Sequence, residues 1–368
     1  MRLSVASRSL FGIIGSFDRD HRSISCQNAE GREDLRKDMP RPLRASWICK
    51  RRFRRPVMST PPPPPPSPSS SAATRLIGIG AALLTVLIWA GWIVATRHSV
   101  STNLGPIDIG LLRYGVPALL LLPAWGRLGP LPRRLPAGLL AVMVIGSGAP
   151  FLLLGAMGMS LAPAGHAGAL MPGTMPLWAG LIGITLMGER PGRLRLGGLV
   201  LIGLGALVLA FPVVAGGNGG LGEGVLLGAG ALWAAYTHAF RRSGLSAPQA
   251  AGLVAVWSLA LHLGLAAVAG TALLHLPLVD LLTQTLIQGV LSGFIAILCY
   301  GVAVRRLGAT PAAAFSALVP VLAILGGWAF LGEAPTPSDL AGGTITGLGV
   351  LLATGIGPPL AARARPKA

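Results

Sequence analysis

Charged residues are scarce in this sequence, and acidic residues are the scarcest of them. Of its 368 residues, 12 are Asp or Glu and 30 are Lys or Arg, whereas 52% are hydrophobic. This balance excludes a soluble globular domain and a disordered chain. The three cysteines, Cys26, Cys49 and Cys299, lie far apart without a paired spacing. They therefore indicate no disulfide framework, zinc site or CxxC redox motif.

The sequence also lacks the motifs of several functional classes. It has no GxxxxGK[ST] loop for ATP and no HExxH or GxSxG motif. It has no pair of acidic residues of the intramembrane-protease kind, and no filter or gate motif of an ion channel. We therefore expect no catalytic residues, no cofactor and no metal site.

From Leu76 onward, the chain consists of apolar segments separated by short polar loops. Each segment approaches the roughly 20 residues that a helix needs to cross a ~30 Å hydrocarbon core. The ten segments cover residues 76–96, 108–125, 136–159, 164–187, 196–215, 223–240, 249–274, 284–304, 312–331 and 339–358. The expected fold is therefore all-α and integral to the membrane, with ten transmembrane helices.

The basic residues predict the orientation of these helices. With the N-terminus in the cytoplasm, 14 of the 16 basic residues after residue 57 fall in inner loops or flanks. Arg97 falls in an outer loop and Arg113 inside a span. The outer loops otherwise carry His166, Glu223, Asp280, Glu333 and Asp339. This positive-inside pattern supports the count of ten and predicts a bacterial inner (plasma) membrane protein with both termini cytoplasmic.

Residues 1–72 are expected to be a disordered, basic and proline-rich extension. The first 57 residues hold 14 of the 30 basic residues, and Pro61–Pro66 follow soon after. Such a tract is solvated and cannot bury a core, and Met58 is a candidate for the true start. Residues 359–368 are expected to be a cytoplasmic tail. The net charge of +18 is read as membrane topology, so no nucleic-acid partner is expected.

The apolar region repeats itself at an offset of 144 residues. The recurring pairs are Trp89-Ala90 with Trp233-Ala234, Pro176 with Pro320, and Gly188-Glu189-x-Pro191 with Gly332-Glu333-x-Pro335. The two copies span residues 77–212 and 222–356. Because each copy holds five helices, an odd number, the second copy enters the membrane from the opposite side. Two inverted repeats that rock about a shared site are typical of secondary transporters.

Together these features resemble the drug/metabolite transporter superfamily, specifically its EamA-type members. The resemblance is carried by Trp-Ala in the first helix, by Arg113-Tyr114 in the second, and by Pro176 ahead of Gly188-Glu189-Arg190-Pro191. It covers about residues 77–356 and implies ten helices that move small metabolites. The second copy departs from the pattern, since its Gly332-Glu333-Ala334-Pro335 lacks the arginine and nothing corresponds to Arg113.

Five side chains in the helices are candidates for contact with a solute. Trp89 and Trp92 in the first helix share a helix face, as do Trp233 and Tyr236 in the sixth. They form either an aromatic wall for an apolar or cationic solute, or anchors at the membrane interface. Arg113 is either an anchor for a substrate carboxylate or a side chain that snorkels to the outer surface, because burial of an arginine costs roughly 2.5–3.5 kcal/mol.

Three prolines are candidates for a gating role. Pro172 and Pro176 are expected to interrupt the fourth helix, and Pro320 the ninth. Discontinuous helices at matching places in two halves indicate a binding site, whereas the structural alternative is a packing kink.

Glu189 and Glu333 follow the interrupted helices and have two interpretations. Each either caps the next helix or pairs with a nearby arginine, for Glu189 one of Arg190, Arg193 and Arg195, or it couples transport to protons. His262 in the seventh span and His166 beside the fourth are further protonatable candidates.

We therefore expect a secondary transporter of small metabolites such as amino acids or amines. It is expected to work by alternating access in the direction of export, with the lipid bilayer as its surroundings. Either the proton is the coupling ion or the exchange is facilitated and uncoupled. The alternative is a membrane enzyme or a non-transporting receptor or scaffold, and the oligomeric state is left open.

Overall fold

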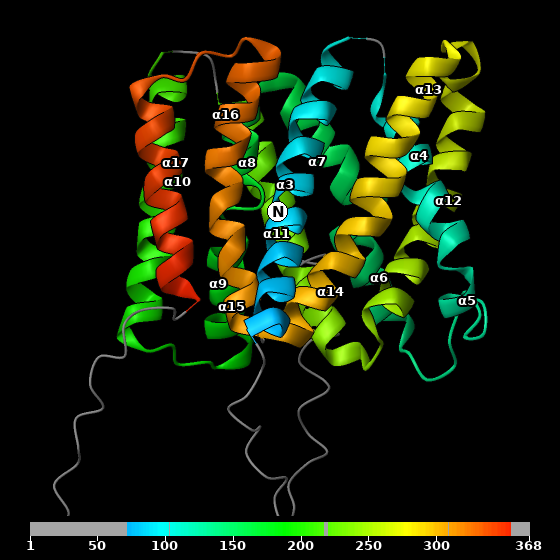
Figure 1. Ribbon diagram of the computed structural model, residues 1–368, viewed down its shortest axis with the longest axis horizontal. Helices are drawn as coiled ribbons and strands as arrows, with labels where there is room; N and C mark the ends of the chain where they lie inside the picture. The colour runs from blue at the N-terminus through cyan, green and yellow to red at the C-terminus, as the bar shows by residue number, and fades with distance from the viewer. Residues whose placement is uncertain (1–71, 103, 217–219, 308, 355–368) are drawn as a thin grey trace, which may run out of the picture. The chain divides into compact units, whose positions relative to one another are not determined.

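The computed structural model describes residues 72–102, 104–216, 220–307 and 309–354, and these residues form a bundle of helices (Figure 1). This part of the chain contains no strand. The expected N-terminal extension up to residue 71, including Met58, and the tail at residues 359–368 lie outside the described residues.

The first half of the bundle runs from α3 to α10. Its helices are α3 (Ala72–Ser101), α4 (Pro106–Leu120), α5 (Leu122–Trp125), α6 (Ala137–Ser147), α7 (Ala149–Leu161), α8 (Ala164–Leu170), α9 (Met175–Met187) and α10 (Arg193–Ala215). Helices α6 and α7 follow one another across Gly148, and α8 and α9 follow one another across a turn, so each pair forms one longer segment.

The second half runs from α11 to α17. Its elements are α11 (Leu221–Ser243), α12 (Ala247–Ala269), the 3₁₀ turn η4 (Leu273–His275), α13 (Leu278–Gln284), the π-helix η5 (Thr285–Ile295), α14 (Ala296–Leu307), α15 (Ala309–Ala314), the 3₁₀ turn η6 (Phe315–Leu318), α16 (Val319–Leu331) and α17 (Pro337–Ala353). The elements α13, η5 and α14 form one continuous segment.

Seven helical segments in the described residues are long and apolar enough to cross a membrane. They are residues 73–101, 137–161, 164–187, 193–215, 247–269, 278–307 and 312–331. Of the others, α4 has 15 residues and α17 has 17, while α11 carries Glu223 and Arg241 near its two ends. The all-helical membrane fold is therefore confirmed, whereas ten crossings stay a prediction.

Helices α9 and α16 are equivalent in the two copies of the repeat. Each has 13 residues and ends at a glycine with a positive φ, 66° at Gly188 and 70° at Gly332. The N–H of the next residue donates to a carbonyl inside the helix, Glu189 to Gly183 at 2.9 Å and Glu333 to Gly327 at 3.1 Å. Only glycine adopts this left-handed conformation without strain, so the Gly-Glu pair is a helix stop in both copies.

The chain is also interrupted at equivalent places ahead of α9 and α16. Residues 171–174 form the turn between α8 and α9, and residues 315–318 form the 3₁₀ turn η6. Pro172 lies in the first of these turns, whereas Pro176 and Pro320 stand in the first turn of the helix that follows. A proline there removes no intrahelical hydrogen bond, so Pro176 and Pro320 begin helices rather than kink them.

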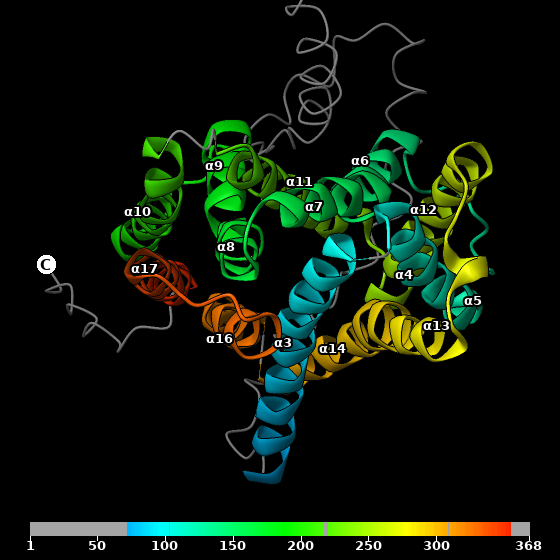
Figure 2. The same ribbon diagram turned by 90° about the horizontal axis from the view of Figure 1, so that it is seen from above.

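Helices α10 and α17 pack against each other along four glycines, Gly198, Gly205, Gly342 and Gly349, which we call the glycine seam (Figure 2). A Cβ on Gly198 would lie 2.7 Å from the Gly349 carbonyl oxygen, and one on Gly205 would lie 2.8 Å from that of Gly342. The numbers rise along one helix as they fall along the other, so the two helices are antiparallel. Since Gly342 and Gly349 are the repeat equivalents of Gly198 and Gly205, the contact is reciprocal, as a two-fold relation between the repeats requires.

We predict that a larger residue in the glycine seam destabilises the protein. In Gly205→Val the new side chain meets the backbone of α17, which forces the two helices apart at a cost of about 1–3 kcal/mol. Thermal unfolding in detergent would show a lowered midpoint. Gly203→Val is the matched control, because the nearest atom to its Cβ is 3.9 Å away. Equal midpoints for the two variants would contradict close packing at the seam.

Candidate functional site

Among the arginines of the described residues, Arg113 in α4 is buried, with 9% of its surface exposed. Its guanidinium carbon lies 4.3 Å from the centroid of the Trp92 ring, and its Nη1 donates to the Ser292 hydroxyl. A cation over an indole face gains about 2 kcal/mol when both are removed from water. The side chain therefore lies inside the bundle, against aromatic and hydroxyl groups, and not at its surface.

The groups around Arg113 come from both repeats. Trp92 belongs to α3 and Ser292 to the π-helix η5. No carboxylate among the described residues lies within ion-pair distance of Arg113. A buried guanidinium has five N–H donors and is costly to bury without an anion. The site therefore has an unmatched positive charge.

A row of polar side chains continues from Ser292 along the same face of the bundle. Gln288 is fully buried and lies 3.4 Å from the Thr96 hydroxyl, and Gln284 donates to the Ser99 hydroxyl at 2.9 Å. The π-helix brings these residues of α13 and η5 against α3, and π-helical turns occur often at functional sites. The sequence analysis did not identify Thr96, Gln288 and Ser292 as candidates. Each is a polar residue within an apolar segment, and this was the only feature that could have indicated it.

Two nitrogens buried against α4 have no hydrogen-bond partner, Trp92 Nε1 beside Arg113 and His262 Nε2 beside Gly110. The Nδ1 atom of His262 lies 2.8 Å from the Ser258 carbonyl oxygen, which accepts its proton and leaves Nε2 as an acceptor in the neutral ring. His262 also packs on Gly110, whose Cβ would lie 1.9 Å from Nε2. This histidine is therefore a packing residue, whereas the indole N–H of Trp92 is a free donor beside the guanidinium.

The four candidate aromatic residues lie in different surroundings. Trp92 is buried against Arg113, whereas Trp89 packs on Tyr300 of α14 with ring centroids 5.7 Å apart. Trp233 contacts Phe151 of α7 at 5.0 Å and Tyr236 at 5.5 Å. The structure therefore joins Trp92 to Arg113, and it places Trp89 and the Trp233–Tyr236 pair in separate aromatic contacts.

Glu189 and Glu333 have equivalent backbones but different partners. Glu189, which follows α9, pairs with Arg195 of α10 at 3.4 Å, and the two side chains are 34% and 43% exposed. Glu333 pairs with Arg97 of α3 at 2.9 Å, and its other oxygen accepts from the Ala164 N–H at 2.8 Å. Arg97 also donates to the Met159 carbonyl. Of these two glutamates, Glu333 links the two repeats, whereas Glu189 pairs within its own repeat.

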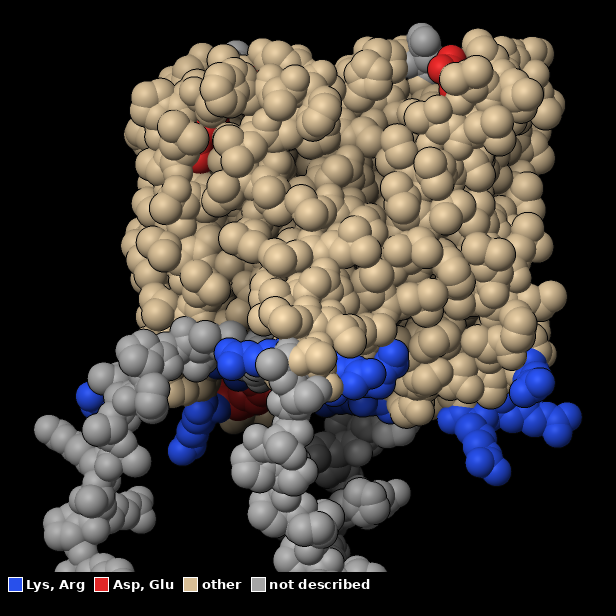
Figure 3. Space-filling view, in the orientation of Figure 1, with Lys and Arg blue, Asp and Glu red and all other residues tan. Residues whose placement is uncertain are grey.

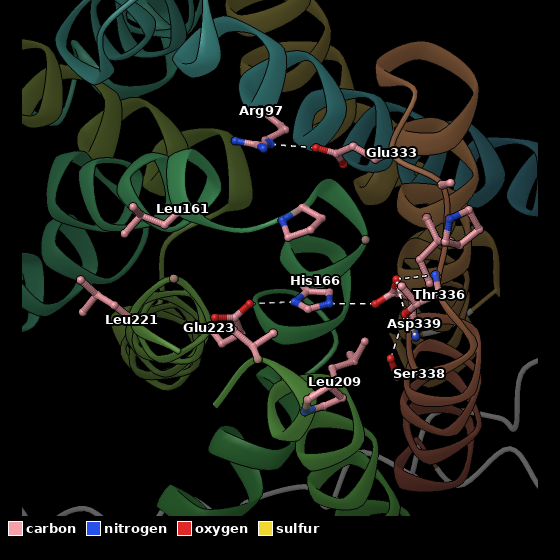
Figure 4. Close-up of a pocket in the computed structure, with 18 residues that line it drawn as sticks. Arg97, Leu161, His166, Leu209, Leu221, Glu223, Glu333, Thr336, Ser338 and Asp339 are labelled. Atoms are coloured by element: carbon pink, nitrogen blue, oxygen red, sulfur yellow. Dashed lines mark hydrogen bonds and ion pairs between the residues drawn. The ribbon is translucent and has the colours of Figure 1, made fainter. Parts of the chain in front are cut away.

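Most of the arginines gather at one end of the molecule, visible along the lower edge of Figure 3, which we call the basic end. Glu333 and Asp339 lie at the other end, the far end. A cleft of about 830 Å³ lies at the far end (Figure 4). Its polar lining comprises Arg97, His166, Glu223, Glu333, Thr336, Ser338 and Asp339.

His166 lies between two carboxylates in this cleft (Figure 4). Its Nδ1 is 2.8 Å from Glu223 Oε1 and its Nε2 is 2.8 Å from Asp339 Oδ1. We call these three residues the histidine cluster. Its members come from α8, α11 and α17, and His166 and Glu223 are 5% and 4% exposed.

The structure corrects the expectation that these polar residues occupy outer loops. Arg97 lies near the end of α3, and His166, Glu223 and Asp339 lie in the first turns of α8, α11 and α17. These polar side chains pair with one another across the helix ends, which lowers the cost of their burial.

An all-helical membrane bundle of two equivalent halves with polar contacts between them is the architecture of a solute transporter. The EamA-like transporter family matches residues 76–211 and again residues 220–355, so this chain belongs to that family. It is therefore a membrane transporter and not an enzyme.

Two individual proteins are also similar to this chain. A protein of Streptantibioticus cattleyicolor, described as a probable terminal-alkyne amino-acid exporter, is 30% identical over 296 residues, which cover 74% of this chain and 92% of that protein. A solved crystal structure, 20% identical, matches with a TM-score of 0.52 over 77% of this chain and 97% of the other. The second likeness shows a shared fold.

We predict that the two repeat-equivalent glutamates contribute unequally to stability. Glu333→Gln removes the charge partner of Arg97 in a pair whose side chains are 22–23% exposed, whereas Glu189→Gln removes one partner of a longer and more exposed pair, of a kind worth about 0–1 kcal/mol. The thermal unfolding midpoint in detergent should fall clearly for Glu333→Gln and little for Glu189→Gln. The reverse order would mean that the Arg97–Glu333 pair does not hold the far end together.

Proposed function

We propose that this transporter exports small amino acids and binds their carboxylate at Arg113. The proposal rests on one observation. The Arg113 guanidinium is buried against an aromatic ring and a hydroxyl group, and no carboxylate of the described residues lies within ion-pair distance of it. A substrate carboxylate would supply the missing anion through two parallel N–H···O bonds, the geometry that guanidinium favours. The described activity of the Streptantibioticus protein, amino-acid export, supports the same solute class.

The neighbours of Arg113 suit an amino acid that enters and leaves. While the site is empty, the Trp92 face and the Ser292 hydroxyl stabilise the cation, so the empty state is not prohibitively costly. Because Trp92 and Ser292 come from different repeats, relative motion of the repeats changes the site. Such motion about a shared site is alternating access.

Repeat-equivalent ion pairs suggest how two states alternate. The far-end pair Arg97–Glu333 corresponds, at the offset of 144, to Arg241 and Glu189 at the basic end. In this conformation Glu189 pairs with Arg195 instead. In the opposite state, the inverted relation would pair Arg241 with Glu189 and separate Arg97 from Glu333.

The distribution of charge supports a proposed orientation in the membrane. Arginines of the helix ends and of the connecting loops gather at the basic end, which would therefore face the cytoplasm (Figure 3). Ten crossings, both termini in the cytoplasm and a bacterial inner membrane complete the proposed topology. The far-end cleft would then open to the outside.

We predict that Arg113 selects for a carboxylate. Purified protein in liposomes would be tested with labelled neutral amino acids and with the amines that result from their decarboxylation. Arg113→Lys keeps the charge but loses the planar fork, so amino-acid flux should fall about tenfold to a hundredfold, as expected for a charged hydrogen bond. Amine flux should change little.

The control for this experiment is Arg127→Lys, an exposed arginine at the basic end, which should leave both fluxes unchanged. Equal loss of amino-acid and amine flux in Arg113→Lys would show that Arg113 only supports the fold. Absence of amino-acid flux in the unmodified protein would reject the solute class.

We predict that Arg241 supports transport by pairing with Glu189 in the opposite state. Arg241→Glu should reduce flux because it opposes Glu189 in the opposite state, and the double variant Arg241→Glu with Glu189→Arg should restore it. Arg242→Glu is the control, since this neighbouring exposed arginine has no such partner. Failure of the second substitution to rescue flux would argue against the alternating pair.

A further inference from the structure

The histidine cluster contains one more hydrogen bond than its deprotonated form can make. A carboxylate only accepts hydrogen bonds, and a neutral imidazole has a single N–H. Yet both ring nitrogens of His166 lie 2.8 Å from a carboxylate oxygen, one of Glu223 and one of Asp339. In the fully deprotonated cluster, one of these contacts would bring a nitrogen lone pair against a carboxylate.

Both contacts are satisfied only when the cluster holds one additional proton. The proton either makes His166 an imidazolium between two carboxylates or protonates one carboxylic acid beside a neutral ring. In both cases the three residues carry a net charge of −1, and the proton belongs to the cluster rather than to one residue. The two short contacts therefore depend on proton occupancy.

Other charged groups that face His166 do not supply this proton. Arg97 of α3 and Glu333, which follows α16, line the same cleft but are paired with each other at 2.9 Å. The remaining lining from α7 and α10 is apolar, namely Leu161, Leu209, Pro212 and Val213. Since the cluster lines a cleft, the proton can come from the water in it.

The histidine cluster joins the two repeats. His166 belongs to the first repeat, whereas Glu223 and Asp339 belong to the second. Loss of the proton turns one contact repulsive and so releases α11 or α17 from α8. By linkage, the histidine cluster must bind the proton more tightly when the far end is closed than when it is open.

The sequence provides no equivalent cluster for the basic end. At the offset of 144, Glu223 and Asp339 correspond to Ile79 and Arg195, and His166 corresponds to Thr310, or to Ala314 where Pro163 is matched with Pro311. None of these residues can form a histidine–carboxylate contact, so proton binding of this kind is confined to one end of the transporter.

We propose that His166, Glu223 and Asp339 form a proton-binding site that closes the far end of the transporter. The inference rests on the proposed function in one respect, namely that the far end opens to release solute. A proton from the outer solution then restores both contacts and returns the repeats to the closed arrangement. Outer acidity would thus favour the return step after export.

The test follows the distance between α7 and α17 at the mouth of the cleft as pH is changed. Spin labels on cysteines at the exposed Leu161 and Leu340 would be measured by double electron–electron resonance, in full-length protein whose three native cysteines are replaced by serine. Between pH 5 and pH 9, a longer-distance population should grow as pH rises. Its ratio to the short-distance population should change by up to about tenfold per pH unit, the limit for one proton.

The decisive variant is Glu223→Gln. The amide can donate to one ring nitrogen while the single imidazole N–H donates to Asp339, so both contacts form without an additional proton. The short distance should then persist across the pH range. His275→Gln replaces an exposed histidine in the segment between α12 and α13 and should titrate like the unmodified protein.

Two outcomes would overturn the proposal: no change of distance with pH in the unmodified protein, or a Glu223→Gln variant that titrates as the unmodified protein does. Amino-acid flux, measured in parallel, separates this proposal from the proposed function. A pH-dependent distance without amino-acid flux would reject the solute class and keep the proton site. Flux with a pH-independent distance would reject the proton site alone.

Discussion

The contact on which the rest of the structure depends is the glycine seam between α10 and α17. Apolar surfaces gain little from meeting each other in lipid, so helices associate there through close packing of small residues. Glycine allows backbone atoms of the two helices to meet at distances that any Cβ would block. Because the contact pairs each glycine with the repeat equivalent of the other, it relates the two helices, one from each repeat, by a local two-fold axis.

Buried polar groups elsewhere in the bundle are under a different constraint. Each must have a hydrogen-bond or ion-pair partner, because burial without one costs free energy. Arg113 has a positive charge without a carboxylate, whereas the histidine cluster has more acceptors than donors unless it is protonated. The first arrangement suits an anionic group of a solute, and the second suits a proton. A solute and a proton would thus bind at separate places while both bias the same motion of the repeats.

The two repeats are more alike in backbone structure than in the side chains that make polar contacts. Glu189 and Glu333 follow the same glycine stop, yet one pairs with a neighbour in its own repeat and the other with Arg97 across the interface. Arg113 and the histidine cluster have no counterparts in the other half of the sequence. The two halves therefore have an equivalent scaffold but unequal side chains at the ends of the bundle.

The sequence by itself determined the helical membrane fold, the duplication and the position of the interrupted segments. These properties follow from local rules of hydropathy, glycine and proline that need no knowledge of packing. The sequence pattern predicted loops for Arg97, Glu223 and Asp339, which the structure places in helices. It also gave no sign that Arg113 contacts Ser292, 179 residues away, or that His166 contacts Asp339, 173 residues away. Only the tertiary structure decided these pairs, because the side chains that meet are set by how distant helices cross.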